Sequence, residues 1–112
     1  MHEEYQDCID ACNDCAVECE HCASECLQED NVKMLARCIA LNHDCARICY
    51  TASGLMASGS EFARDLCRLC AEICRACGAE CRKHKMEHCQ LCADACERCA
   101  EECEKMATAR VA

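Results

Sequence analysis

The cysteines of this 112-residue chain recur at intervals that alternate between three and four residues. In three segments the alternation is unbroken, and its average of 3.5 residues returns every cysteine to one face of an α-helix. Each segment therefore predicts a helix with a continuous stripe of thiols, at the positions that a coiled coil gives to leucine. The three runs are Cys8, Cys12, Cys15, Cys19, Cys22 and Cys26; Cys67, Cys70, Cys74, Cys77 and Cys81; and Cys89, Cys92, Cys96, Cys99 and Cys103.

A fourth segment, between the first two runs, carries only Cys38, Cys45 and Cys49. These three share one helical face, and we expect Leu41 and Ile48 to replace cysteine in part of it. Asn42 lies near the same face, where a hydrogen-bonding role is favoured over an oxygen contact to a metal ion. The segment is expected to form a helix whose role is mainly structural.

The rest of the composition favours helix throughout. Proline is absent and glycine occurs three times, so few residues interrupt the pattern. We place breaks at residues 28–31, 54–60 and 83–85, with the second helix continuing through Gly54, Gly59 following its end and Ser60 capping the next helix. Small residues lie beside the stripes and allow close helix approach: Ala16, Ala23, Ala71, Gly78, Ala93 and Ala100.

Short connections make sequential helices antiparallel neighbours. The predicted fold is all-α, an antiparallel up-down-up-down four-helix bundle with a cysteine-lined core and helices of about 22 to 27 residues. A chain of 112 residues is the length of one domain, so residues 1–112 are expected to form a single metal-binding domain.

Charge and hydropathy exclude several classes of partner. The formal net charge of −9 argues against nucleic acid, whose phosphates require clustered lysine and arginine. No apolar run approaches the ~20 residues that cross a bilayer, so we expect no membrane association. The acidic first residues do not resemble a secretory signal, which indicates a cytoplasmic protein. In that reducing compartment, abundant cysteine points to metal binding before disulfides.

A single buried cysteine is usually a small core residue. Leucine would contribute more burial at every stripe position, so unbroken thiol stripes indicate chemistry instead of packing. Residues at i and i+4 lie on adjacent turns, and two thiolates of one helix can therefore converge on one ion. The candidate pairs are Cys8/Cys12, Cys15/Cys19, Cys22/Cys26, Cys45/Cys49, Cys70/Cys74, Cys77/Cys81, Cys92/Cys96 and Cys99/Cys103.

Thiolates select Cu(I), Zn(II) or iron–sulfur clusters. Zinc requires four ligands in a closed tetrahedral set, and we expect stripes on straight helices to present no such discrete quartets. Iron–sulfur clusters are usually held by cysteines on loops. Cu(I) accepts two-coordinate sites, so a continuous stripe of thiols can hold many Cu(I) ions. Sequestration of Zn(II) or Cd(II) remains the alternative.

Histidine and methionine gather at one predicted end of the bundle. His84, Met86 and His88 precede the last helix, and Met34 is expected at the same end. These weaker Cu(I) ligands suit capture and transfer, so we predict a copper port there. Met56 and Met106, with His2, form a thinner alternative at the other end. No role is assigned to His21 or His43.

The three cysteine runs and the His84-x-Met86-x-His88-Cys89 segment resemble the four-helix-bundle copper storage proteins, in particular the cytosolic branch, over essentially the whole chain. The resemblance implies Cu(I) held largely by pairs of thiols within one helix, methionine and histidine at an open end, and a homotetramer. Copper chaperones or recipient enzymes would be its partners. The second helix, with only three cysteines, departs from the family pattern, so the four helices are not assumed to bind copper equally.

Two other classes fit the residues less well. In a thiol redox protein the cysteines would form disulfides, for which i and i+4 positions on a rigid helix have poor geometry. An enzyme would require a catalytic constellation, and the sequence shows no Ser-His-Asp set, phosphate loop or acid-base carboxylate pair. We therefore expect a binding protein and no enzyme.

Overall fold

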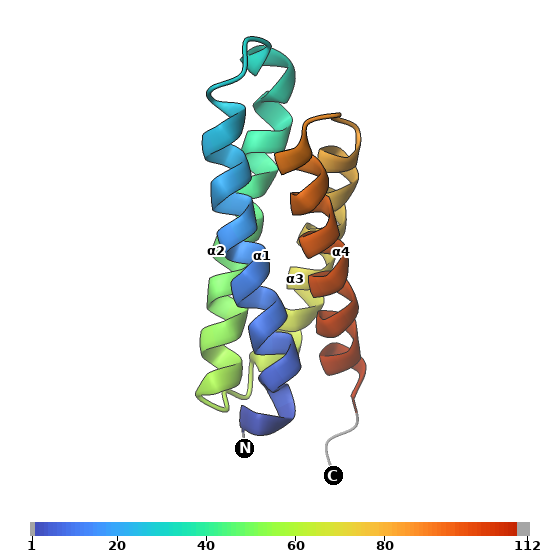
Figure 1. Ribbon diagram of the computed structural model, residues 1–112. Coiled ribbons are helices and arrows are strands. Elements are labelled where there is room, and N and C mark those ends of the chain that lie inside the picture. Colours follow the sequence, from blue (N-terminus) through green and yellow to red (C-terminus); the bar gives the residue numbers. More distant parts are fainter. Residues whose placement is uncertain (1, 110–112) are drawn as a thin grey trace.

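The computed structural model describes residues 2–109, apart from the side chain of His2. Four helices run antiparallel along the long axis of a molecule measuring 51 × 19 × 17 Å (Figure 1). Each packs against its neighbour in sequence, and the first packs against the last. The helices are α1 (Gln6–Cys26), α2 (Ala36–Ala57), α3 (Ala63–Arg82) and α4 (Glu87–Thr108). The predicted four-helix bundle is confirmed.

The helices contain 20 to 22 residues, so α2 and α4 reach the lower limit of the expected lengths and α1 and α3 are slightly shorter. A short 3-10 helix precedes each of the first two: His2–Tyr5 before α1 and Val32–Leu35 before α2. None of the helices in residues 2–109 is long and apolar enough to cross a membrane.

The turn after α2 ends the helix as the sequence predicted. The helix continues through Gly54, and Gly59 has a φ of 70°, which residues with a Cβ adopt only at a cost. The Gly59 amide donates to the carbonyl of Met56 at 3.2 Å, and the Ser60 amide donates to that of Leu55 at 2.9 Å. This pair of bonds is a Schellman motif, and it directs the chain back along the bundle.

Ser60 lies too early to cap α3. The helix begins at Ala63, and its N-cap residue is Phe62. The Ser60 hydroxyl accepts a hydrogen bond from the Phe62 amide at 3.1 Å, and the Ser60 carbonyl accepts one from Ala63 at 3.1 Å. The prediction for Ser60 is therefore wrong in position, because an extra turn precedes the helix.

Cysteine fills the core. All 19 cysteines are at most 1% exposed, and the six small residues predicted beside the stripes are buried among them. Leu35 and Met56 are the only apolar side chains larger than cysteine that are fully buried in the part of the chain described. The core is therefore poor in the large aliphatic groups that usually stabilise a bundle.

The buried face of α2 corrects one expectation. Its cysteines are continued at the same alternating interval by Asn42, Ala52 and Met56, which are fully buried. Leu41 and Ile48, expected to replace cysteine, are only partly buried at the edge of the core. The stripe of α2 is therefore as regular as the others, but its residue types are mixed.

Two helical glycines provide a matched pair of substitutions. A Cβ at Gly54 would meet nothing within 4 Å, whereas a Cβ at Gly78 would lie 3.1 Å from the Cβ of Cys96 on α4. We expect Gly54→Ala to raise the free energy of unfolding by about 1 kcal/mol through helix propensity. Gly78→Ala should show no such gain, because close α3–α4 packing opposes it. Chemical denaturation measures both, and equal stabilisation would contradict the close approach.

Candidate metal centre

Thiols on successive turns of one helix lie side by side. Five of the predicted i,i+4 pairs have Sγ atoms 3.8 to 3.9 Å apart. They are Cys15/Cys19, Cys22/Cys26, Cys45/Cys49, Cys70/Cys74 and Cys99/Cys103. Bound to one ion, such a pair would supply two ligands from a single helix.

Thiols of different helices lie equally close. The Sγ atoms of Cys38 and Cys81 are 3.5 Å apart, as are those of Cys45 and Cys74, and both pairs join α2 to α3. Between α1 and α4 the corresponding distances are 3.6 to 3.9 Å. The thiols therefore form a connected network along the bundle, and the sparse α2 takes part in it.

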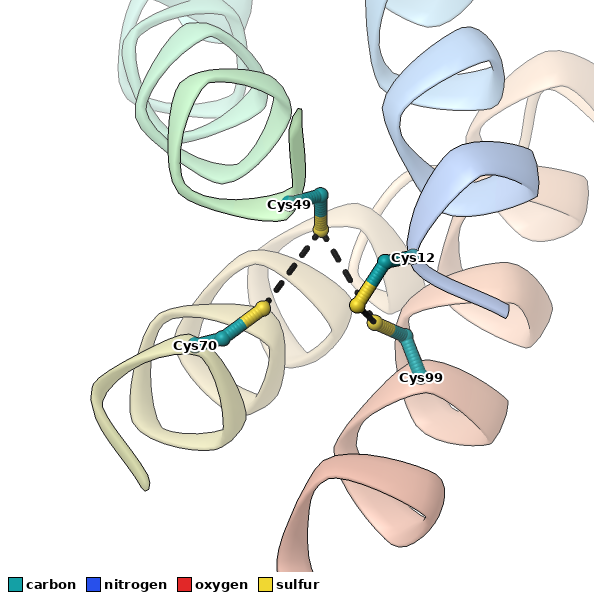
Figure 2. Close-up of side chains that lie close together, drawn as sticks. All are labelled: Cys12, Cys49, Cys70 and Cys99. Carbon is teal, nitrogen blue, oxygen red and sulfur yellow. Dashed lines mark hydrogen bonds between the residues drawn. The ribbon is translucent and has the colours of Figure 1, made fainter. Parts of the chain in front are cut away.

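One level of this network takes a thiol from each of the four helices (Figure 2). The Sγ atoms of Cys12, Cys49, Cys70 and Cys99 all lie within 4.8 Å of one another. Cys12 and Cys99 are 3.6 Å apart, and Cys49 lies 3.7 Å from Cys70 and 3.8 Å from Cys99. In Figure 2 the four side chains converge on one space between the helices.

Discrete quartets therefore exist, and the expectation that straight helices present none is wrong. The helices pack so that thiols of different stripes meet at the same height along the bundle axis. The spacing of cysteines within one helix does not reveal this alignment. Similar groups occur elsewhere in the core. They include Cys15/Cys49/Cys74/Cys99, Cys15/Cys19/Cys45/Cys96, Cys19/Cys77/Cys92/Cys96 and Cys22/Cys26/Cys38/Cys89.

Asn42 is the one fully buried amide in the described core. Its Oδ1 accepts from the Sγ of Cys77 at 3.2 Å, of Cys92 at 3.3 Å and of Cys81 at 3.5 Å, and its Nδ2 donates to Cys38 at 3.9 Å. These contacts agree with the hydrogen-bonding role favoured from the sequence. Asn42 also links thiols of α2, α3 and α4 at this level.

His88 lies over the outermost thiols. Its Nδ1 is 3.5 Å from the Sγ of Cys89, 3.6 Å from that of Cys22 and 4.0 Å from that of Cys26. Its Nε2 contacts Oε2 of Glu29 at 2.9 Å. Burial alone would lower the pKa of His88, but Cys22 and Glu29 outweigh it and raise the pKa. The imidazole thus separates the thiol network from solvent at this end.

The three thiols near Nδ1 of His88, those of Cys22, Cys26 and Cys89, differ in their tendency to ionise. Burial raises the pKa of Cys26 and of Cys89 above the ordinary value. Hydrogen bonds from Cys38 and Cys81 lower the pKa of Cys22 to about 5, with a smaller contribution from His88. Cys22 is therefore the most readily ionised of these three thiols, and it faces the imidazole.

His84 does not join the thiols. Its Nε2 lies 3.0 Å from Oε2 of Glu80, a carboxylate that sequence reasoning missed. Glu80 is buried and also contacts Lys83 at 3.3 Å and Arg37 at 3.4 Å. Burial alone would raise the pKa of Glu80, but hydrogen bonds from His84 and Lys83 outweigh it and lower the pKa. The i,i+4 spacing of Glu80 and His84 in the sequence could have predicted this contact.

The remaining candidates take different positions. Met86 packs against the core at the start of α4, whereas Met34 is 74% exposed. At the opposite end Met56 is wholly buried and Met106 partly buried. The third member of that alternative port, the side chain of His2, lies outside the described part of the structure. His21 and His43, to which no role was assigned, are exposed.

Comparison with known proteins agrees with the cysteine-lined bundle. Residues 1–108 match the copper storage protein family. The chain belongs to this family. Its resemblance to these proteins, inferred from the cysteine runs, is confirmed. Among curated proteins, the uncharacterised cysteine-rich protein YhjQ of Bacillus subtilis is 49% identical over 87 residues, which are 77% of this chain and 81% of the relative.

Two solved members of the family have the same fold. The Cu(I)-bound copper storage protein BsCsp3 of Bacillus subtilis is 47% identical, with a TM-score of 0.89 over 96% of this chain and 100% of the other. A cytosolic copper storage protein from Streptomyces lividans, described as holding five coppers, is 34% identical, with a TM-score of 0.93 over 98% of this chain and 97% of the other.

Proposed function

We propose that this chain stores many Cu(I) ions in the core of its bundle, bound by the cysteine thiolates. The observation that carries the proposal is the connected thiol network. All 19 cysteines are buried and free, and neighbouring Sγ atoms approach to within 4 Å inside helices and between them. Relatives of the same fold bind Cu(I) and hold several copper ions, which supports the same ligand here.

The charge of the core favours a monovalent ion. In residues 3–109 no lysine, arginine or histidine side chain is fully buried, so no cation of the protein neutralises the inner thiolates. A Cu(I) ion that replaces a thiol proton leaves the local charge unchanged. A divalent ion in a quartet of thiolates leaves two negative charges in the buried core, which is costly.

This argument also sets the capacity. One Cu(I) for each thiolate keeps the core neutral at every stage of loading, so we expect saturation near 19 ions, the number of cysteines. Titration against a chromophoric Cu(I) chelator tests the function directly. Saturation after one or two ions per chain would reject storage.

Sequestration of Zn(II) or Cd(II) is the second candidate, and the quartets of Figure 2 are the observation that favours it. Thiolate-to-metal charge-transfer absorption distinguishes the two metals during competition. We expect Cu(I) to displace Zn(II) completely, because thiolates prefer the softer ion and the core prefers the lower charge. Retention of Zn(II) under excess Cu(I) would favour the second candidate.

The port is proposed at the end that holds His88. Its Nδ1 faces three thiols, whereas His84 is bound to Glu80 and Met86 lines the turn between them. His88 is thus the first ligand for arriving copper, with Met86 and His84 in supporting positions. All 19 cysteines are proposed as ligands inside the bundle.

We place the protein in the cytoplasm, as the Streptomyces relative is described as cytosolic. The match over residues 1–108 supports a single metal-binding domain. Assembly as a homotetramer is proposed by resemblance to the family. Chaperones that deliver copper, or enzymes that receive it, would be transient partners. Binding accounts for the thiol network, and we propose no catalytic role.

A further inference from the structure

Glu29 lies in the turn between α1 and α2, and its carboxylate reaches His88 at the start of α4. Oε2 of Glu29 and Nε2 of His88 are 2.9 Å apart, although 59 residues separate them in sequence. The side chain of His88 is 11% exposed and that of Glu29 33% exposed, so the contact is partly shielded from water. The pair joins the end of α1 to the beginning of α4 directly beside the port thiols.

The contact determines which ring nitrogen faces the core. An ionised carboxylate only accepts hydrogen bonds, so Nε2 of His88 has to carry a hydrogen. Nδ1 is therefore the nitrogen left to bind a metal ion, and it points at the Sγ atoms of Cys89, Cys22 and Cys26. Without the carboxylate, the ring could rotate or place its hydrogen on Nδ1, facing the thiols.

Glu29 is itself held in place by the helix that carries two of those thiols. Its backbone amide donates to the carbonyl of Cys26, the last residue of α1, at 3.2 Å. The backbone of Glu29 is therefore fixed relative to Cys22 and Cys26, and from there the carboxylate reaches Nε2 of His88. The carboxylate of Glu29, the imidazole of His88 and the thiols therefore lie in one row, in which the carboxylate orients the imidazole toward the thiols. Carboxylates that contact metal-binding histidines commonly act in this way.

We propose that Glu29 is a positioning residue for His88, which turns Nδ1 toward Cys22, Cys26 and Cys89 and so speeds capture of the first Cu(I) ions. The proposal rests on the storage function proposed above, and it adds a role that the thiols do not supply. Glu29 acts through the imidazole and contributes no ligand to the core. It should therefore change the rate of loading without changing the final capacity.

Glu29→Ala tests the proposal, with Glu25→Ala as its control. Glu25 is exposed near the same end of α1, and its removal changes the net charge by the same amount. Stopped-flow mixing with one Cu(I) per chain should show uptake slowed by about 10- to 100-fold in Glu29→Ala. Saturation should remain at the wild-type number of ions, and Glu25→Ala should load at the wild-type rate.

A second readout does not involve copper. The 15N NMR signals of the His88 ring in the metal-free protein report which nitrogen carries hydrogen, and Glu29→Ala should shift them toward a mixture of tautomers. Glu29→Gln keeps an oxygen that can accept from Nε2, so it should restore the wild-type tautomer and most of the rate.

Two results would overturn the role of Glu29 in a protein that stores copper: loading of Glu29→Ala as fast as that of Glu25→Ala, or unchanged His88 signals in Glu29→Ala. If the wild type binds no Cu(I), the storage function itself fails, and the role assigned to Glu29 in capture fails with it.

Discussion

Loading with Cu(I) is expected to raise the melting temperature of the protein by more than about 20 °C. An ion that binds only the folded bundle stabilises it by about 4 kcal/mol when its free concentration is a thousand times Kd. In a domain of this size each kcal/mol shifts the melting temperature by roughly 4 °C or more. A few occupied sites therefore suffice, and the network offers many.

The metal-free protein should have low stability, so that bound copper can raise its melting temperature by this amount. Leu35 and Met56 are the only apolar side chains larger than cysteine that are fully buried between residues 3 and 109, and the other stripe positions hold smaller groups. Each thiol contributes less buried area than a leucine would, so packing alone stabilises the bundle weakly. Bound ions would link α1 to α4 and α2 to α3 through shared thiolates.

Differential scanning calorimetry of metal-free and loaded protein measures the effect. The loaded sample should return to the lower melting temperature after excess Cu(I) chelator removes the ions, which excludes irreversible oxidation as the cause. Equal melting temperatures before and after loading would show that copper binds outside the core.

Thiol periodicity was enough to predict the fold, because every cysteine of a stripe has to lie on the same side of its helix. The prediction was weakest for α2, where Asn42, Ala52 and Met56 occupy stripe positions. No single residue type reveals that face, so Leu41 and Ile48 were assigned to it wrongly. A side chain is buried because of its position on the helix, and a sequence does not reveal that position when the residues of the buried face are of different types.

The quartets and the contact of Glu29 with His88 could not be predicted from the sequence for another reason. Spacing reports neighbours within one helix, but the level at which Cys12 meets Cys49, Cys70 and Cys99 depends on how the turns set the helices against one another. The contact of Glu29 with His88 likewise depends on the folded turns at one end. The packing of the helices against one another therefore determines which residues surround His88 and which groups of four thiols form.

Removing the port thiols should slow copper uptake far more than removing the same number of thiols at the other end. The triple variant Cys22→Ala, Cys26→Ala, Cys89→Ala takes away every thiol that faces Nδ1 of His88. Copper arriving there would find no thiolate near the imidazole. We expect the initial rate to fall by more than about tenfold, because the variant removes ligands themselves and the loss of an outer-shell partner alone commonly costs about 10- to 100-fold.

The matched control removes Cys8, Cys67 and Cys103, which lie against one another at the far end of the bundle. Both variants delete three buried thiols, so they should lose similar stability, and each should store about three fewer ions, one per missing thiolate. Only the port variant should load slowly in stopped-flow mixing. If the far-end variant were the slow one, copper would enter beside Met56 and Met106, and the contacts of His88 would have another purpose.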